Sequence, residues 1–357
     1  MADVILQNIT KRFKTVTALK GVSFDIKDGE FFVLLGPTGA GKTTTLRVIS
    51  GLERQDEGSV LFDGESVDHL TPADRDVAFV FEQYSLYPTM TVYENLAFPL
   101  RSPLRRMSEQ VIRQRVEETA EKLRISPLLE RTTAHLSGGE MQRVSLGRAL
   151  VRDPQIFLMD EPLSNLDAKL REALRVELQH LQKTEGSTTL FVTHDQIEAL
   201  TMGDRIGVLN KGRIVQIGTP EDIYDRPATT FVAQLVGTPR INLHEAVRED
   251  STLHVTNSTI HLPIPAGDDL PPSFLLGVRP EDVQIHSEGG FLGQIALIEP
   301  LGVQTILHVK TGEQTLLSLV PGMTDLRVGE EVRFNVVRER LHYFQPDGTR
   351  ISVERKT

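Results

Sequence analysis

The 357 residues include no cysteine and no tryptophan. Without cysteine there can be no disulfide bond, thiolate metal site or cysteine nucleophile, and such a sequence is typical of a reduced, intracellular protein. Long hydrophobic runs are also missing, because the run at residues 31–35 is far shorter than the roughly 20 residues of a membrane-spanning helix. Residues 1–4 carry no basic stretch before an apolar core, so we expect no secretory signal. Any membrane role is therefore expected to come through a partner.

Positive charge is scarce as well, because 39 Lys and Arg face 49 Asp and Glu and leave a formal net charge of −10. This balance has the wrong sign for electrostatic binding to nucleic acid or to anionic lipid. What the sequence does have is an ordinary soluble composition, with 39% hydrophobic and 25% charged residues. A chain of this length is typical of two folded domains.

The pattern of apolar residues divides the chain at about residue 235. Before that point, short apolar runs alternate with amphipathic helical patterns, which is typical of a wound α/β sheet. The runs predict buried strands at residues 31–35, 77–81, 156–159, 189–192 and 206–209. A charged segment with helical spacing, at about 100–150, predicts a helical insertion. From 236 to 357, short runs separated by Gly, Pro, Asp and Asn predict a second, all-β domain in the form of a small barrel.

A glycine-rich segment follows the first predicted strand and precedes a helical pattern. It fits the P-loop pattern G-x-x-x-x-G-K-[ST] and consists of Gly36, Pro37, Thr38, Gly39, Ala40, Gly41, Lys42, Thr43 and Thr44. The glycines let successive backbone N–H groups turn toward phosphate, and the following helix presents its positive end. Lys42 would neutralise phosphate oxygens, and the Thr43 hydroxyl can ligate Mg²⁺. We therefore predict a nucleotide phosphate site.

Two carboxylates, Asp160 and Glu161, come directly after the apolar run at 156–159. Alone, two acids at the end of a strand also fit a solvated loop, but the P-loop upstream favours a site, because the strand ends of an open α/β sheet are where catalysis occurs. Asp160 would hold Mg²⁺ through its water shell. Glu161 would orient and deprotonate the attacking water, since phosphoryl transfer needs positioning and charge neutralisation.

A further glycine pair makes the chain resemble the nucleotide-binding subunit of an ABC transporter. The segment at 136–142 is similar to that family's LSGGQ signature and consists of Leu136, Ser137, Gly138, Gly139, Glu140, Met141 and Gln142. Without the family, Ser-Gly-Gly before a helix is an ordinary N-cap. The resemblance implies that Ser137, Gly138, Gly139 and Glu140 act on the γ-phosphate bound by a second subunit, so that two cassettes meet head to tail. Glu140 stands where the family has glutamine.

Other segments resemble family elements in the expected order. Residues 164–167 are similar to the D-loop, which links the two active sites, with Asp167 as its acid. Thr193, His194 and Asp195 resemble the switch region, which implies that His194 contacts the γ-phosphate and the attacking water. Phe13 lies at the position of the aromatic residue that stacks on adenine; from the sequence alone it also fits a core residue.

The segment at 80–88 resembles the family's Q-loop but departs from it at one position. Glu82 stands where the family has its magnesium-contacting glutamine, and Gln83 comes one residue late. A carboxylate can still ligate Mg²⁺, but it adds negative charge near the γ-phosphate and cannot donate a hydrogen bond. We expect ATP binding to survive and the catalytic rate, or its coupling to transport, to be altered.

The octapeptide at 276–283 looks like the motif of the OB-like regulatory domain, called TOBE, of importer ATPases, and with it the resemblance covers essentially the whole chain. The resemblance implies an α/β P-loop ATPase cassette with a helical subdomain, followed by this TOBE domain. It is strongest to the carbohydrate-importer subfamily, whose substrates are oligosaccharides, polyols, glycerol phosphate and sulfosugars. It implies ATP and Mg²⁺ as ligands and a homodimer on the cytoplasmic face of the inner membrane. Two integral membrane permease subunits would contact residues 84–99 through Tyr87, Met90 and Val92, unless these pack internally, and an extracytoplasmic solute-binding protein would deliver the substrate.

Three alternatives remain open at this point. The same transport mechanism could serve sulfate, iron or a polyamine. A soluble ABC ATPase of DNA repair or translation is disfavoured, because such proteins carry two cassettes, a long coiled-coil insertion or a basic arm. A nucleic-acid-binding OB module would need a basic groove with exposed aromatics, whereas Phe274, Phe291, Phe334, Tyr343 and Phe344 lie among many acids, so we expect no nucleic-acid partner.

Overall fold

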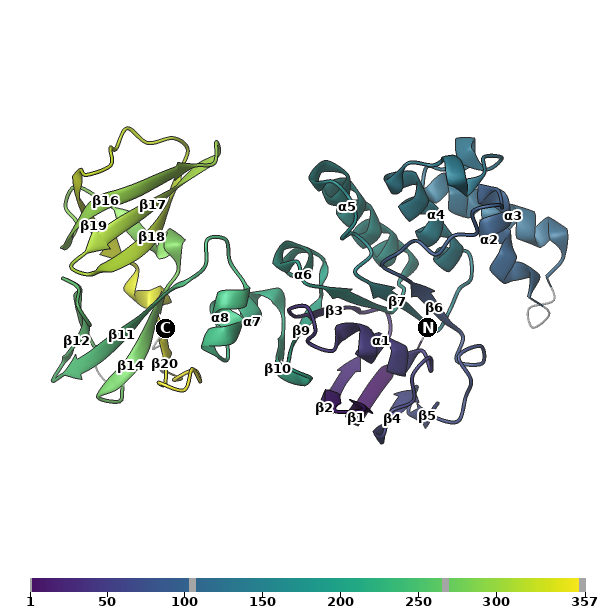
Figure 1. Ribbon diagram of the computed structural model, residues 1–357, viewed down its shortest axis with the longest axis horizontal. Coiled ribbons are helices and arrows are strands. Elements are labelled where there is room, and N and C mark those ends of the chain that lie inside the picture. The colour runs from purple at the N-terminus through teal and green to yellow at the C-terminus, as the bar shows by residue number, and fades with distance from the viewer. Residues whose placement is uncertain (1, 103–106, 265–269, 353–357) are drawn as a thin grey trace. The chain divides into compact units, whose positions relative to one another are not determined.

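The computed structural model describes residues 2–102, 107–264 and 270–352 and forms two compact units, Met1–Pro220 and Glu221–Thr357 (Figure 1). The change of sequence pattern placed the division at about 235, whereas packing places it after Pro220. The difference arises because two short helices, α7 (Pro220–Asp225) and α8 (Thr230–Leu235), pack for the most part with the second unit. Residues 103–106, within the predicted helical insertion, lie outside the described residues.

The first unit is built on a six-stranded sheet with the order β10-β9-β3-β8-β7-β6. Its strands are β3 (Phe31–Leu35), β6 (Val77–Val80), β7 (Ile156–Asp160), β8 (Thr189–Thr193), β9 (Arg205–Asn210) and β10 (Arg213–Gly218). All pair in parallel except β10, which is antiparallel to β9 at the edge. Every residue of β3, β7 and β8 is buried, as expected for parallel strands covered on both faces. The five predicted strands are confirmed, with ends that differ by at most one residue.

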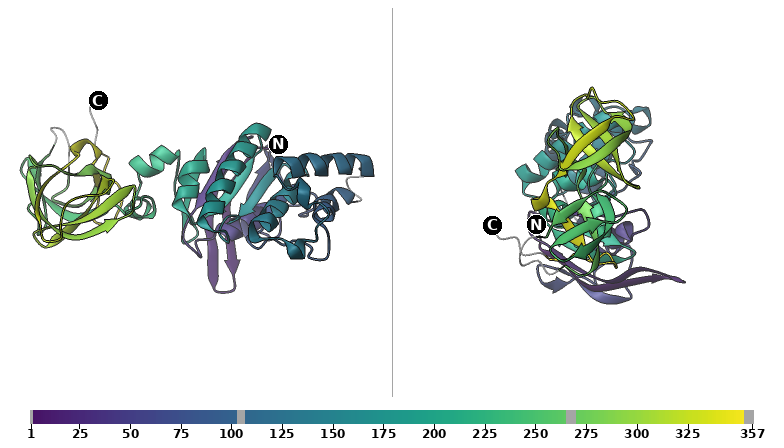
Figure 2. Two further views of the ribbon diagram at one scale, coloured as in Figure 1. Left: turned by 90° about the horizontal axis from the view of Figure 1, so that it is seen from above. Right: turned by 90° about the vertical axis from the view of Figure 1, so that its left-hand side faces the viewer.

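A second, antiparallel sheet in this unit was not among the predicted strands. It has the order β2-β1-β4-β5, with β1 (Val4–Phe13), β2 (Val16–Ile26), β4 (Glu57–Phe62) and β5 (Glu65–Ser66). One face of β1 and β2 packs in the core and the other is polar, so neither strand forms a continuous apolar run. The β1–β2 hairpin, purple in Figure 2, stands out from the rest of the unit.

Helices cover the parallel sheet and form the insertion. The helices that follow site strands are α1 (Lys42–Ile49), α5 (Ala168–Glu185) and α6 (Gln196–Met202). The insertion contains α2 (Val92–Ala97), η1 (Phe98–Arg101), α3 (Glu109–Lys122), η2 (Ser126–Leu128), η3 (Thr133–His135) and α4 (Gly138–Leu150). Its helices share a hydrophobic cluster of their own, which begins at Val92. The helical insertion therefore starts at residue 92, earlier than the apolar pattern indicated.

In its described residues, the second unit is all-β apart from α7, α8 and two 3₁₀ turns, as expected. Its strands form two five-stranded antiparallel sheets, β13-β12-β11-β14-β20 and β15-β19-β16-β17-β18. The strands are β11 (Asn242–Glu249), β12 (Thr252–Val255), β13 (His261–Pro263), β14 (Ser273–Val278), β15 (Val283–Ile285), β16 (Phe291–Pro300), β17 (Gln304–Thr311), β18 (Gln314–Pro321), β19 (Glu331–Val336) and β20 (His342–Phe344). The 3₁₀ turns are η4 (Pro280–Asp282) and η5 (Arg338–Arg340).

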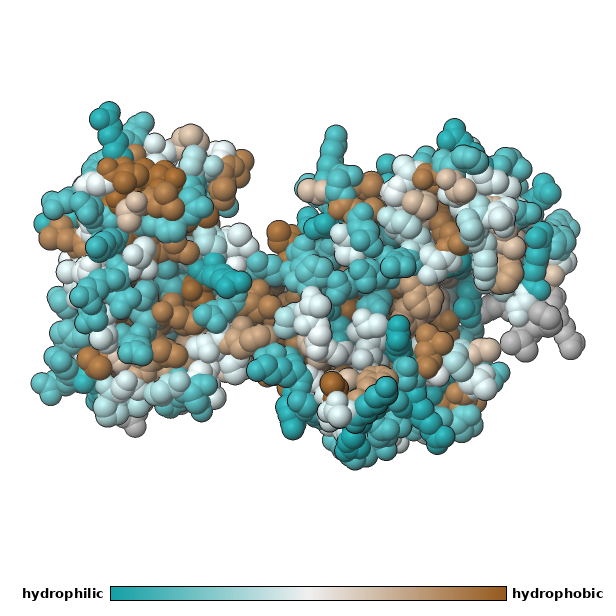
Figure 3. Space-filling view, in the orientation of Figure 1, coloured by the Kyte–Doolittle hydropathy of each residue, from teal (hydrophilic) through white to brown (hydrophobic). Residues whose placement is uncertain are grey.

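Five aromatic side chains of the second unit are not available for stacking on bases. Phe274, Phe291, Phe334, Tyr343 and Phe344 are all buried, none more than 8% exposed. The large exposed hydrophobic residues of this unit are aliphatic side chains and a methionine, from β16 and from loops, and brown surface is visible on this unit in Figure 3. A single-strand-binding surface needs exposed aromatic platforms, so the side chains that could have supplied one serve as core instead.

A buried arginine fastens α7 and α8 to the end of β14. Arg279 is 1% exposed and donates hydrogen bonds to the carbonyls of Ala233 (3.1 Å), Val236 (2.5 Å) and Tyr224 (2.8 Å). Its guanidinium also lies 4.0 Å from the centroid of the Tyr224 ring. The last carbonyls of a helix have no partner within the helix. The planar guanidinium of arginine can donate to several such carbonyls at once. The octapeptide at 276–283 thus has a structural role within the second unit.

Candidate nucleotide site

The predicted chemistry converges at the carboxyl ends of three neighbouring parallel strands, β3, β8 and β7. The P-loop follows β3, and His194 follows β8. Asp160 is the last residue of β7, and Glu161 follows it. Parallel strands bring their carboxyl ends to one edge, which is where ligands bind in open α/β sheets. A cavity of about 710 Å³ opens there, lined by Val16, Thr17, Ala18, Lys20, Thr38, Gly39, Gly41, Lys42, Thr43, Thr44, Glu82, Glu161, Ser164, His194 and Lys211.

The P-loop backbone is shaped by close approaches that only glycine permits. A Cβ atom on Gly36 would lie 2.3 Å from the carbonyl oxygen of Leu209, and Gly41 has a φ of 112°. Gly41 is also the N-cap of α1 and offers no side-chain acceptor to the first turn. The N–H groups at the start of α1 are therefore left for an anion, and the helix dipole favours one.

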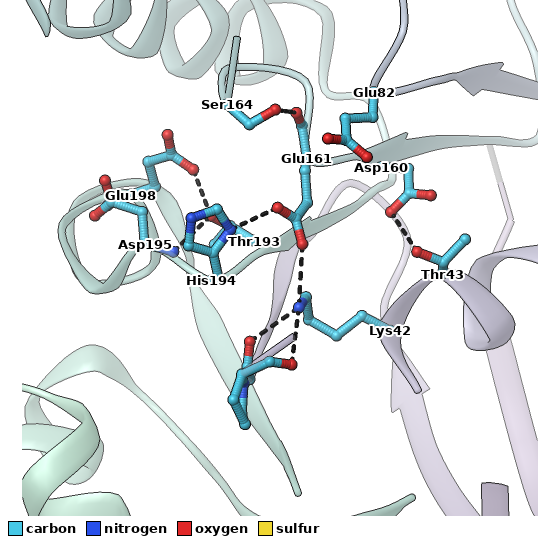
Figure 4. Close-up of polar contacts among 12 residues, drawn as sticks. Lys42, Thr43, Glu82, Asp160, Glu161, Ser164, Thr193, His194, Asp195 and Glu198 are labelled. Atoms are coloured by element: carbon cyan, nitrogen blue, oxygen red, sulfur yellow. Dashed lines mark hydrogen bonds and ion pairs between the residues drawn. The ribbon is translucent and has the colours of Figure 1, made fainter. Parts of the chain in front are cut away.

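Lys42 is held under the P-loop with its charge aimed at this space. The residue is 4% exposed, and its Nζ donates to the carbonyls of Gly36 (2.9 Å) and Pro37 (3.2 Å). The Nζ also lies 3.1 Å from Glu161 Oε1 (Figure 4). A buried ammonium with one carboxylate partner and two carbonyl partners is positioned to neutralise phosphate oxygens.

Thr43 and Asp160 meet from the two sides of the site. Thr43 Oγ1 donates to Asp160 Oδ1 at 3.1 Å, and Asp160 is 7% exposed. Burial raises the pKa of Asp160, with smaller contributions from Glu161 and Glu82, while the hydrogen bond from Thr43 opposes the shift. A divalent cation would offset this unfavourable negative charge, so the oxygen donors fit Mg²⁺. Among the described residues no three His, Asp or Glu side chains are placed to hold a metal alone, so phosphate oxygens and water would complete its coordination.

Glu82 lies beside this pair, as its position in the Q-loop-like segment predicts. It lines the cavity, and Figure 4 shows its carboxylate on the same side as that of Asp160. Its backbone carbonyl accepts a hydrogen bond from Asn165 Nδ2 at 3.1 Å. Gln83 is exposed and does not line the cavity. The residue that faces the site is therefore the acid, not the amide that follows it.

Glu161 occupies a strained backbone conformation at the centre of the site. Its φ is 45°, in the left-handed region, and its N–H donates to the carbonyl of Val192 at 3.0 Å. One carboxylate oxygen faces Lys42, and the other lies 2.5 Å from Nδ1 of His194. A residue other than glycine in the left-handed region carries backbone strain of order 1–3 kcal/mol, and such residues cluster at functional sites. Here the unusual backbone turns the carboxylate between a lysine and a histidine.

The residues on either side of His194 are held by hydrogen bonds. Thr193 Oγ1 donates to Glu198 Oε2 at 2.5 Å and accepts from the N–H of Asp195 at 2.9 Å. Asp195 is the N-cap of α6, and its Oδ1 accepts from the N–H of Ile197 at 2.7 Å. Burial raises the pKa of Glu198, which is 3% exposed. The His194 ring itself is half exposed and faces the cavity.

The signature-like segment lies away from this cavity, at the N-terminus of α4. Ser137 caps the helix, and its N–H donates to Glu140 Oε2 at 2.8 Å while the N–H of Glu140 donates to Ser137 Oγ, which is a capping box. These bonds lower the pKa of Glu140. Gly138 and Gly139 form the first turn, and Asp167 caps α5 by accepting from the N–H of Leu170 at 3.0 Å. None of these four signature positions lines the chain's own cavity.

Comparison with known proteins identifies the family. Residues 19–164 match the family described as ABC transporter, and residues 276–344 match the TOBE domain. The trehalose/maltose import ATP-binding protein MalK of Thermococcus litoralis is 44% identical over 372 residues, covering 96% of this chain and 98% of that protein. The chain belongs to the ABC transporter ATP-binding proteins. The sn-glycerol-3-phosphate import ATP-binding protein UgpC of Cereibacter sphaeroides is 43% identical over 352 residues, covering 97% of this chain and 99% of that protein.

Solved structures agree with this ABC fold. The dimeric post-hydrolysis state of the ATP-binding cassette MJ0796, bound to ADP and Pi, superposes with a TM-score of 0.55 at 35% identity. It covers 61% of this chain and 98% of that one, which corresponds to the cassette. The predicted fold class, an ABC cassette followed by a TOBE domain, is confirmed, and the chain is an ABC ATPase.

The three residues predicted to face the permeases differ in exposure. Val92 is 0% exposed and packs in the core of the helical insertion, so the prediction that it faces a partner is wrong. Tyr87 is 38% exposed, and Met90 is half-buried. Val92 is the first residue of α2, and its hydrophobic side chain is needed between α2 and the rest of the cluster. Only Tyr87 of the three presents a large exposed surface.

Some residues that line the cavity could not be found from motifs alone. Phe13 is 41% exposed at the end of β1 and does not line the cavity, although Val16, its partner across the hairpin, does. The stacking role of Phe13 stays a prediction. Val16, Ala18 and Lys20 reach the site from β2, and Ser164 reaches it from the loop after Glu161. No sequence signal marks the β2 residues, because the hairpin brings them there only in the folded chain.

Proposed function

We propose that this chain is the ATP-hydrolysing subunit of an importer for a sugar or sugar-like solute, such as an oligosaccharide, a polyol, glycerol phosphate or a sulfosugar. The observation that carries the solute class is full-length similarity to proteins named for the import of trehalose and maltose and of sn-glycerol 3-phosphate. The match includes the second unit, so it is not limited to features that ABC cassettes share.

The geometry supports a division of labour for hydrolysis. Lys42 and the N–H groups of the P-loop and α1 bind and orient the phosphates. Glu161 accepts the proton of the attacking water, because its carboxylate lies at the centre of the cavity edge between Lys42 and His194. His194 orients that water and the γ-phosphate. Thr43, Asp160 and Glu82 would hold Mg²⁺, which would supply positive charge where negative charge develops on the phosphate oxygens.

We further propose that the working form is a homodimer on two membrane permease subunits at the cytoplasmic face of the inner membrane. The signature positions support this, because they lie at the N-terminus of α4 and outside the chain's own cavity. A second copy placed head to tail would bring Ser137, Gly138 and Gly139 to the nucleotide of its partner. In the part of the chain that the structure describes, no helix is long and apolar enough to cross a membrane. The exposed side of Tyr87, beside Phe98 at 4.6 Å between ring centroids, is the surface we assign to the permeases.

The test is transport by the chain with its own permeases and solute-binding protein in proteoliposomes loaded with ATP and Mg²⁺. The solutes are maltose, trehalose, glycerol 3-phosphate, sulfate and spermidine, and the matched control is Glu161→Gln. Uptake of a sugar or of glycerol phosphate that stops with Glu161→Gln supports the proposal. Uptake of sulfate or spermidine alone overturns the solute class while leaving the ATPase in place.

A further inference from the structure

We propose that Arg171 is a positioning residue for hydrolysis, which ties the segment carrying Asp167 to the segment carrying His194. The inference rests on the proposed roles of Glu161 and His194. Arg171 belongs to no motif and does not line the cavity. It lies in the first turn of α5, where its N–H donates to the carbonyl of Asp167 at 2.9 Å.

The first link runs from Arg171 to the loop after Glu161. Arg171 Nη2 donates to the carbonyl of Leu166 at 3.0 Å and to that of Ser164 at 3.4 Å. Ser164 in turn donates to the carbonyl of Glu161 through its N–H (3.2 Å) and its hydroxyl (2.9 Å). The loop from Glu161 to Asp167 is thus fastened at one end to the residue we assign as base and at the other to Arg171.

The second link runs from Arg171 to the segment after β8. Arg171 Nη1 lies 3.6 Å from Asp195 Oδ2, while Asp195 Oδ1 caps α6. Asp195 directly follows His194, and its N–H is held by Thr193 Oγ1, which is itself bound to buried Glu198. A change in the position of Arg171 is therefore expected to shift Asp195 and, with it, the neighbouring His194.

The two links close a ring of contacts around the reacting centre. It passes from Glu161 through Ser164 and Arg171 to Asp195, and returns from His194 Nδ1 to Glu161 Oε2 at 2.5 Å. Arginine can hold two carbonyls and a carboxylate at once because its guanidinium presents donors in a fixed plane. Lysine, with a single nitrogen, cannot hold all three in this arrangement.

The energetics separate positioning from stability. The Arg171 and Asp195 side chains are 33% and 25% exposed, and their closest nitrogen-to-oxygen distance is 3.6 Å. Ion pairs of this kind contribute little to folding, so a variant should fold. Misplacement of catalytic groups by about 1 Å can lower a rate by about a hundredfold. Loss of Arg171 is therefore expected to change the rate of hydrolysis far more than the stability.

The experiment compares Arg171→Met, Arg171→Lys, Asp195→Asn and the double variant Arg171→Met/Asp195→Asn in the full chain. Asn is as good an N-cap as Asp, so Asp195→Asn keeps the α6 cap and removes only the charge that faces Arg171. The matched control is Arg175→Met, one turn further along α5, where the structure places the arginine in no hydrogen bond or ion pair within the described residues. The measurements are kcat, the KM for ATP, the affinity for a fluorescent ATP analogue, and the melting temperature.

We expect Arg171→Met to lower kcat about tenfold or more, with the KM for ATP and the nucleotide affinity changed less than twofold. Arg171→Lys should recover part of the rate. The double variant should be no slower than Arg171→Met, because replacing Arg171 already removes its contact with Asp195. Three outcomes overturn the proposal. The first is a kcat of Arg171→Met within twofold of wild type. The second is a double variant whose fold-loss of kcat is the product of the two single losses, and the third is a loss of kcat accompanied by a matching fall in melting temperature. If instead Glu161→Gln hydrolyses ATP at the wild-type rate, the assignment of the base fails, and the Arg171 results still report on the ring.

Discussion

Glu161 and His194 are joined by a 2.5 Å contact between a carboxylate oxygen and Nδ1 of the imidazole. They come from the ends of β7 and β8, adjacent strands in the sheet. The second oxygen of Glu161 faces Lys42 Nζ at 3.1 Å. The carboxylate is thus placed between an ammonium group and an imidazole ring. The roles proposed for these three residues require the charge of Glu161, not only its size.

The first prediction concerns Glu161→Gln. The amide keeps the shape of the side chain but cannot accept the proton of the attacking water, so we expect ATP binding to persist and hydrolysis to fall by at least about a hundredfold. The variant should accumulate as a dimer with ATP and Mg²⁺. Turnover measured beside size-exclusion chromatography with ATP tests both points, and Glu172→Gln on exposed α5 surface is the control. Equal turnover in Glu161→Gln and wild type would mean that another group is the base.

The second prediction concerns Lys42→Ala. Lys42 Nζ donates to two P-loop carbonyls as well as facing Glu161, so its loss removes phosphate neutralisation and loosens the loop. Charged hydrogen bonds contribute about 1.5–3 kcal/mol, which corresponds to roughly a ten- to hundredfold weaker affinity for ATP. Titration with a fluorescent ATP analogue measures it. Arg47→Ala on the exposed side of α1 removes a charge from the same helix and should leave the affinity unchanged.

The third prediction concerns Glu82→Gln, which restores the amide typical of the family. Removing this carboxylate lowers the pKa of Asp160, since Glu82 is one of the charges that raise it. We expect nucleotide affinity to stay within about twofold, the Mg²⁺ concentration for half-maximal turnover to rise, and kcat to change by roughly two- to tenfold. Gln83→Glu, at the exposed neighbour, is the control. If both the Mg²⁺ requirement and the rate of Glu82→Gln match wild type, Glu82 has no part in the site.

How much of this was readable from the sequence depends on the range of the interactions. The P-loop, Asp160 with Glu161, and His194 each follow a buried apolar strand, so local pattern placed all three at one sheet edge. The β1–β2 hairpin was missed because its alternating pattern is not a continuous apolar run, and with it the cavity wall from β2. The contacts of Arg171 were also invisible, since they join residues brought together only by packing of α5 beside α6.

The last prediction uses the pH dependence of Asp282, in the second unit. Asp282 is 3% exposed, its Oδ1 lies 3.3 Å from Arg340 Nε, and its Oδ2 has no hydrogen-bond partner among the described residues. Burial raises its pKa from 3.8 to about 6, Arg340 and Arg279 oppose the shift, and Glu281 and Asp225 add to it. The folded chain therefore binds this proton more tightly than the unfolded chain. Asp282 therefore lowers the unfolding free energy only when it is ionised. The unfolding free energy falls as pH rises through about 4 to 6, by up to about 3 kcal/mol.

Asp282→Asn should remove that dependence. The unfolding free energy of the variant minus that of wild type is expected to rise between pH 4 and about 6 and to level off above, measured by amide hydrogen exchange of peptides from the second unit. Asp347→Asn is a control of opposite sign, because hydrogen bonds from Thr349 lower the pKa of Asp347, so its carboxylate stabilises the folded chain as pH rises. A difference for Asp282→Asn that does not vary with pH would show that the pKa of Asp282 is the same in the folded and the unfolded chain, so that Arg340 fully offsets its burial.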